Sequence, residues 1–218
     1  KEILIASSPI DEQIVTVDIP YDSELYYKVL HLRTGPEIFQ ENGRRRYVWT
    51  FSHLAARSME PFQPLDVEYL PTLIFSTGHN FEEIFTSWTS QEAFQWNVNN
   101  EMKERVAKIK SLQADPFRQA LDIRKLVIDE FNLFDVPLEY IGYRVRPAEE
   151  TWISNGGTEA EKSVLLCAFL KEAGIPAILV AAIPEGLMDQ SIGCLGILKN
   201  FLVQVSTKEV GSVFLSAV

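Results

Sequence analysis

The pattern of hydrophobic and polar positions changes once along the chain, from strand-like alternation to helical spacing. In segments 15–19 and 47–51 every second residue is apolar, which predicts strands with one buried face. Asn42-Gly43 lies just before the second of these segments and predicts a tight two-residue hairpin. From Asn80 onward, apolar residues recur at i, i+3, i+4 and i+7, as in a helix. We therefore expect two domains, residues 1–77 and 78–218.

The second domain begins with a series of helices. The first is expected from Asn80, and a second runs through Met102 and Ile109. A third starts at Asp115-Pro116, where Asp is a good N-cap and proline suits the first helical position. These helices precede the stretch around which the rest of the domain is organised.

That stretch, residues 151–177, reads as a loop, a buried helix and a turn into a strand. Thr158 and Glu161 have the spacing of a capping box. Residues 164–170 are apolar without interruption, so the helix is expected to be surrounded by protein on all sides. Gly174 ends the helix. Residues 178–182 are then predicted to form a buried strand, followed by a long loop at 184–196 and a hairpin of strands 201–205 and 213–215.

Two segments of this stretch carry a family resemblance, Gly157-Thr-Glu-Ala-Glu-Lys-Ser-Val-Leu-Leu166 and Gly174-Ile-Pro-Ala177. Together they resemble the core of the transglutaminase-like superfamily. That family includes transglutaminases, papain-like proteases and related amidases. The resemblance implies an α+β fold, in which a β-sandwich precedes a core with a central buried helix packed on an antiparallel sheet. The first 77 residues are similar to the sandwich of secreted bacterial members. We expect only its later part here, within a fragment of a longer periplasmic or extracellular protein.

The family places a catalytic Cys in the first turn of the central helix, a His at the start of a following strand and an Asp on the next strand. The corresponding positions here are Glu159, Phe201 and Ser216. A carboxylate is a poor acyl acceptor and cannot replace a thiolate in this cycle. Independently of the resemblance, the chain contains no histidine after residue 79, the three histidines being His31, His53 and His79. We therefore expect a degenerate catalytic centre, with Glu159 stabilising the helix N-terminus.

Four further residues are candidates for binding, namely Tyr143, Arg146, Trp152 and Asn155. The resemblance places the segment leading into the central helix across the active-site face, so these side chains could rim a cleft. The alternative is that the aromatic side chains pack on the central helix and the arginine is left in solvent, since aromatic residues are buried well on average.

Composition excludes several classes of function. The net charge of −10 and the pI near 4.9 argue against a nucleic-acid surface. The basic run 44–46 is interpreted as a solvated strand end rather than a phosphate site. No apolar run is long enough to span a membrane. No cofactor motif or metal-ligand spacing occurs, Cys167 is expected to be a buried inert thiol, and Cys194 falls in a loop.

These observations favour a catalytically inactive transglutaminase-like module that acts in binding or scaffolding, with an unidentified protein, peptide or glycan as partner. Two alternatives stay open at this point. One is a hydrolase or amidase of altered chemistry, with Glu159 as general base. The other is a carbohydrate- or peptide-binding protein that uses Trp49 and its neighbours.

Overall fold

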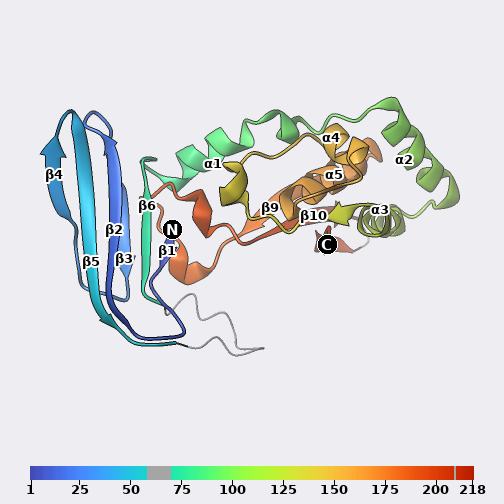
Figure 1. Cartoon of the computed structure of the whole chain (residues 1–218). Helices are drawn as coiled ribbons and strands as arrows, with labels where there is room; N and C mark the ends of the chain where they lie inside the picture. The colour runs from blue at the N-terminus through green and yellow to red at the C-terminus, as the bar shows by residue number, and fades with distance from the viewer. Residues whose placement is uncertain (58–69, 209) are drawn as a thin grey trace. The chain divides into compact units, whose positions relative to one another are not determined.

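The computed structural model describes residues 1–57, 70–208 and 210–218. The chain forms an α+β structure in which antiparallel sheets come first and helices packed with a further sheet follow, so the predicted fold class is confirmed (Figure 1). Two compact units can be distinguished. The N-terminal unit comprises Lys1–Thr86 and Pro184–Ile197, and the C-terminal unit comprises Ser87–Ile183 and Leu198–Val218.

In its described residues, the N-terminal unit contains two three-stranded antiparallel sheets. One has the order β2–β5–β4, formed by Ile10–Pro20, Arg44–Leu54 and Glu37–Glu41. The other has the order β1–β6–β3, formed by Glu2–Ile3, Thr72–Ser76 and Tyr26–Leu30. The predicted hairpin joins β4 to β5, and its turn residues Asn42 and Gly43 have φ of 53° and 72°, as such a turn requires.

Side chains from both sheets meet in one core, so this unit is a β-sandwich. Trp49 of β5 is fully buried there, together with Leu73 of β6. The ring of Tyr27 on β3 contacts the Trp49 ring edge-on, with 5.2 Å between centroids. The hypothesis that Trp49 forms a carbohydrate- or peptide-binding surface is therefore wrong, because the alternation of β5 turns this side chain inward.

The basic run at the start of β5 is held by neighbours in its own sheet. Arg44 donates to the Asp18 carboxylate at 2.7 Å, and Arg46 lies 3.8 Å from the other oxygen of that carboxylate. The guanidinium of Arg45 lies over the Tyr21 ring, 5.1 Å from its centroid. These contacts agree with a strand end beside acidic and aromatic neighbours.

The segment predicted as a long loop, 184–196, belongs to the N-terminal unit. It contains two 3₁₀ helices, Glu185–Leu187 and Leu195–Ile197. The Gly193 amide donates to the Gly78 carbonyl at 3.1 Å, and the Ser76 hydroxyl donates to the Gly193 carbonyl at 2.7 Å. Lys28 and Asp189 form an ion pair at 2.6 Å. These bonds tie the segment to β3, to the end of β6 and to Gly78, which follows it.

Helix α1 (Phe81–Thr89) runs from one unit into the other, and four more helices follow in the C-terminal unit. These are α2 (Asn100–Leu112), α3 (Pro116–Glu130), α4 (Ala148–Ile153) and α5 (Glu159–Glu172). Asn99 caps α2, and Asp115 caps α3 as predicted. Two further 3₁₀ helices are Glu92–Gln95 and Leu138–Ile141.

The sheet of the C-terminal unit has the order β11–β10–β9 and is antiparallel throughout. Its strands are β9 (Ala177–Ala182), β10 (Asn200–Thr207) and β11 (Gly211–Ser216), so the predicted C-terminal hairpin is confirmed. In addition, the short strands β7 (Asn132–Leu133) and β8 (Gly156–Gly157) pair in parallel.

Helix α5 is the centre of this unit, in contact with α2, α3, α4, β9 and β10 (Figure 1). Every residue from Ala160 to Leu170 is buried, so the predicted fully buried helix is confirmed. Both halves of the capping box are present, since Thr158 accepts from the Glu161 amide and Glu161 accepts from the Thr158 amide. The buried side chains include the charged Glu161 and Lys162.

The prediction that strand 178–182 is buried is wrong. Ile178 is 63% exposed, and the other residues of β9 after Ala177 are not fully buried. Within the described chain, α5 covers one face of the sheet, and the opposite face also leaves Phe214 of β11 57% exposed. An apolar strand needs only one covered face to form, and apolar run length alone does not reveal which face that is.

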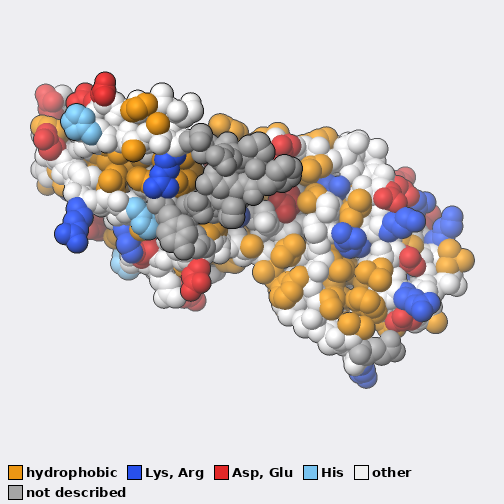
Figure 2. All heavy atoms as spheres, turned by 90° about the horizontal axis from the view of Figure 1, so that it is seen from below, with side chains coloured by type: hydrophobic (Ala, Val, Ile, Leu, Met, Phe, Trp, Pro, Cys, Tyr) orange, Lys and Arg blue, Asp and Glu red, His pale blue; other side chains and the backbone are white. Residues whose placement is uncertain are grey.

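Among the described residues, no helix combines the length and the apolar character needed to cross a membrane. On the face seen in Figure 2, the described Lys and Arg side chains lie among Asp and Glu side chains and form no continuous basic area.

Candidate functional site

Two glycines bring the chain into the N-terminus of α5. A Cβ on Gly156 would lie 2.8 Å from the Asn132 carbonyl oxygen, and one on Gly157 would lie 2.8 Å from the Glu161 carboxylate. Neither approach is possible for a residue with a side chain unless the neighbours move. The pair therefore permits the close β7–β8 pairing and places Thr158 at the helix N-cap.

Glu159, in the first turn of α5, holds the start of β10. Its Oε1 atom accepts the backbone N–H of Phe201 at 3.1 Å. The Ser163 hydroxyl, one turn further along the helix, donates to the Phe201 carbonyl at 3.3 Å. Both main-chain polar groups of Phe201 are thus bonded to side chains of α5, and the structure brings Glu159 and Phe201 together.

The Phe201 side chain is buried against the Trp88 ring. It is only 4% exposed, and its ring lies 5.9 Å from that of Trp88. Trp88 also contacts Phe94 edge-on at 4.9 Å, and its indole N–H donates to the Tyr143 carbonyl at 2.7 Å. Glu159 is therefore bonded to the main chain of a residue whose ring is buried.

The structure does not bring Ser216 to this pair. In the β10–β11 register Ser216 is opposite Leu202, so its side chain lies on the other face of the sheet from Phe201. Its hydroxyl bonds to the main chain of Val218, and its carbonyl accepts from Arg124. Ala217, the next residue, lies on the same face of the sheet as Phe201 and is fully buried. Neither residue offers a group that could orient a base beside Phe201.

Arg146 and Glu161 form a second arrangement at the same helix end. The guanidinium donates to both carboxylate oxygens, Nε to Oε1 at 2.7 Å and Nη2 to Oε2 at 3.0 Å. It also donates to the Ser154 hydroxyl and the Gly156 carbonyl. With 26% of its side chain exposed, Arg146 is not left in solvent, and that part of the alternative interpretation is wrong. No spacing pattern in the sequence predicts that Glu161 is the partner of Arg146.

The carboxyl of Glu161 is 4% exposed and keeps its charge in that position. Burial opposes ionisation, but the hydrogen bonds from Arg146 and from the Thr158 amide outweigh it and lower the pKa of Glu161. The same pairing raises the pKa of Arg146. Lys162, the next residue, donates to the Phe131 carbonyl at 2.8 Å, and burial lowers its pKa.

The remaining binding candidates have structural contacts. Trp152 packs on Phe169 of α5 and on Phe131, with centroid distances of 5.8 and 5.5 Å, as the alternative interpretation proposed. The main-chain carbonyl of Asn155 accepts from both the backbone and the side chain of Asn132. Tyr143 adopts φ of 59°, and its carbonyl accepts from Trp88 and Gln91. Their role in binding a ligand stays a prediction.

A hollow of about 440 Å³ lies on the Glu161 side of the helix end. We call it the loop pocket, and its lining residues are Phe134, Val136, Ile141, Arg144, Arg146, Glu150, Thr158 and Glu161. Of these lining residues, only Arg146 is among the four binding candidates predicted from the sequence. The apolar residues of 134–141 are irregularly spaced between polar ones, so no period marked them as a wall.

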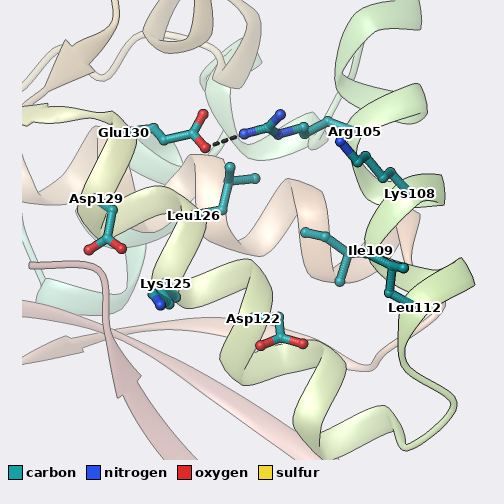
Figure 3. Close-up of a pocket in the computed structure, with 9 residues that line it drawn as sticks. All are labelled: Arg105, Lys108, Ile109, Leu112, Asp122, Lys125, Leu126, Asp129 and Glu130. Atoms are coloured by element: carbon teal, nitrogen blue, oxygen red, sulfur yellow. Dashed lines mark hydrogen bonds and ion pairs between the residues drawn. The ribbon is translucent and has the colours of Figure 1, made fainter.

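Another hollow, of about 280 Å³, lies between α2 and α3. Figure 3 shows Ile109 and Leu126 pointing into the space between these helices, with the ion pair of Arg105 and Glu130 at one end. Lys108 of α2 and, from α3, Asp122, Lys125 and Asp129 also line it. Opposite charges are mixed along this rim, so it shows no preference for a ligand of either sign.

The C-terminal unit has neither an activated thiol nor a histidine. Cys167 is fully buried in α5, and burial raises the pKa of its thiol to about 12. Cys194 and the three histidines of the chain belong to the N-terminal unit. Among the described residues, no group of His, Cys, Asp and Glu side chains could hold a metal ion.

The chain is similar in structure to a putative protease from Parabacteroides distasonis, with a TM-score of 0.86 and 24% sequence identity. The match covers 100% of this chain and 42% of that protein, so the chain spans less than half of its length. At this identity the match shows a shared fold. No family model matches the chain, and no curated protein matches it.

Two further solved structures are more distant. A putative cysteine protease from Cytophaga hutchinsonii has 12% identity and a TM-score of 0.41, the match covering 100% of this chain and 68% of that one. The periplasmic domain of TgpA from Pseudomonas aeruginosa has 10% identity and a TM-score of 0.40, with 98% and 74% covered. These TM-scores are too low to show a shared fold.

Proposed function

We propose that the C-terminal unit is a catalytically inactive transglutaminase-like module that acts in binding or scaffolding. The observation that carries this proposal is the hydrogen bond between Glu159 and the Phe201 amide. By resemblance, these two positions correspond to the nucleophile and the general base of the family. Here they supply a carboxylate, which is a poor acyl acceptor, and a buried phenyl ring, which cannot accept the proton of a nucleophile.

The surrounding contacts support the same proposal. The carboxylate of Glu159 already has a hydrogen-bond partner, and the Phe201 ring is buried against Trp88. The thiol of Cys167 lies within the helix core, where its raised pKa keeps it protonated at neutral pH. A catalytic cysteine–histidine pair cannot form within this unit, because the unit contains no histidine.

The test is to assay the purified chain for peptide hydrolysis and for amine incorporation into a glutamine substrate. Papain and a microbial transglutaminase provide matched positive controls under the same conditions. We expect no turnover above the buffer rate, before or after treatment with iodoacetamide. Turnover that iodoacetamide abolishes would overturn the proposal, because it would require a catalytic thiolate.

The alternative in which Glu159 is a general base makes a different prediction. Turnover would then resist iodoacetamide and be lost in Glu159→Gln, because an amide accepts a hydrogen bond but not a proton. Our proposal expects Glu159→Gln to behave like the unmodified chain in both assays.

A further inference from the structure

We propose that the loop pocket binds a small zwitterion with an apolar side chain, such as leucine or phenylalanine, either free or within a dipeptide. This inference rests on the proposed binding role and names its ligand class. It involves the Glu161 side of the helix end, which has no part in the Glu159–Phe201 contact.

The first observation is an apolar wall that the protein leaves uncovered. Phe134, Val136 and Ile141 line the pocket and are 40%, 41% and 37% exposed. All three come from the single segment 134–144, which passes beside the N-terminus of α5. A small apolar group bound here would remove part of this surface from water, which is favourable.

The second observation is that this wall is held in place. At one end of the segment, the Phe134 amide donates to the Gly157 carbonyl at 2.8 Å. At the other end, Gln91 accepts from the Val145 amide at 3.0 Å and donates to the Tyr143 carbonyl at 3.1 Å. Within the segment, the Tyr143 amide donates to the Leu138 carbonyl. A pre-formed pocket loses little ordering entropy when a ligand binds.

The third observation concerns the charges. Arg146 and Glu161, which both line the pocket, neutralise each other in an ion pair. Arg144 and Glu150 also line it, and within the described parts of the chain neither side chain has an ion pair or hydrogen bond. One cation and one anion are therefore available beside an apolar wall, which matches a carboxylate, an ammonium group and an apolar side chain on one molecule.

The net charge of the chain favours a zwitterion over a simple anion. At −10, the protein repels a carboxylate that carries no compensating charge, whereas a neutral zwitterion is not repelled. The size also fits, because a volume of about 440 Å³ is within the usual range for pockets that hold small molecules.

The test is an NMR titration of the full chain with L-leucine, following the methyl signals of Val136 and Ile141. We expect saturable shifts of these signals. Leucinamide lacks the carboxylate and N-acetyl-leucine lacks the ammonium group, so each should bind at least about tenfold more weakly. The dipeptide Leu-Leu distinguishes the two sources: comparable or tighter binding indicates a peptide, and weaker binding indicates the free amino acid.

Variants assign the two charges. Arg144→Gln and Glu150→Gln should each weaken leucine binding by at least about tenfold. Lys103→Gln changes an exposed residue of α2 outside the pocket and should not alter binding. Absence of saturable shifts would overturn the inference, as would equal binding of leucine and both analogues. The enzymatic assays of the proposed function are unaffected by either result, so the two proposals can fail separately.

Discussion

On each side of the α5 N-terminus a glutamate bonds to a neighbouring segment, but only the Glu161 side has a pocket beside it. On one side, Glu159 holds the backbone of Phe201, whose ring is buried against Trp88. On the other side, Glu161 holds Arg146, and the adjoining segment leaves a hollow. Two carboxylates separated by one residue thus close one face of the helix end and support a pocket on the other. Glu159 is thus bonded to a buried strand start, whereas Glu161 and Arg146 line a hollow.

The largest expected effect comes from opening the closed side. Phe201→Ala removes a buried ring from an aromatic cluster, and it should lower the free energy of unfolding by about 3–5 kcal/mol. Urea denaturation monitored by circular dichroism measures this change. Phe214→Ala, on the exposed face of the same sheet, is the matched control and should stay within about 0.5 kcal/mol. Equal losses in both variants would contradict the packing described for Phe201.

A somewhat smaller loss is expected on the open side. Arg146→Met leaves the Glu161 carboxylate buried without its partner, which should cost about 2–4 kcal/mol, less than a fully buried pair because Arg146 is partly exposed. The control is Arg118→Met, which breaks an exposed pair with Asp115 and should cost no more than about 1 kcal/mol. If Arg146→Met lowered the free energy of unfolding no more than its control does, the Arg146–Glu161 contact would not stabilise the helix end.

The same pair predicts a pH dependence. The pKa of Glu161 is lowered in the folded state, so the unfolded chain binds its proton more readily. The stabilisation is complete above the unfolded pKa of about 4.3 and is lost as pH falls through the folded value. Denaturation curves measured between pH 6 and the acid limit of solubility should therefore show that the free energy of unfolding falls more steeply with pH in the natural chain than in Glu161→Gln. Parallel curves would show that another group carries the acid sensitivity.

The smallest effect is expected for Glu159. Glu159→Gln keeps an acceptor for the Phe201 amide and loses only the interaction of a charge with the helix dipole, about 0.3–1 kcal/mol. Glu159→Ala loses the hydrogen bond as well and should cost roughly 1 kcal/mol more. Thermal denaturation of both variants measures the difference. A larger loss in Glu159→Gln than in Glu159→Ala would be incompatible with a structural hydrogen bond.

Much of the fold could be predicted from the sequence because its signals are local. The capping box at Thr158 and Glu161, the uninterrupted apolar run of α5 and the Asn42-Gly43 turn each act within a few residues. The exposure of Ile178 and the return of segment 184–197 to the N-terminal unit depend on which surfaces meet. Such contacts between distant segments leave no periodic trace in a single sequence.

The candidate site shows the same limit. Glu159 and Phe201 could be paired by resemblance, because the motif fixes their positions along the chain. Ser216 lies one residue from the position that faces Phe201, and a shift of one residue on a strand reverses the face. The partners Arg146 and Glu161, and the wall of the loop pocket, are brought together by the path of a loop. Loop paths follow from tertiary contacts rather than from residue spacing.

The most direct test of the central claim, that Glu159 and Phe201 have replaced a catalytic pair, is the activity of Glu159→Cys. A thiol at this helix N-terminus should have a lowered pKa and react with iodoacetamide, unlike the buried Cys167. Our account predicts that the variant is alkylated but shows no peptidase or amine-incorporation turnover, since Phe201 provides no base. Turnover by Glu159→Cys alone would contradict the account, because it would require a base that the proposed site lacks.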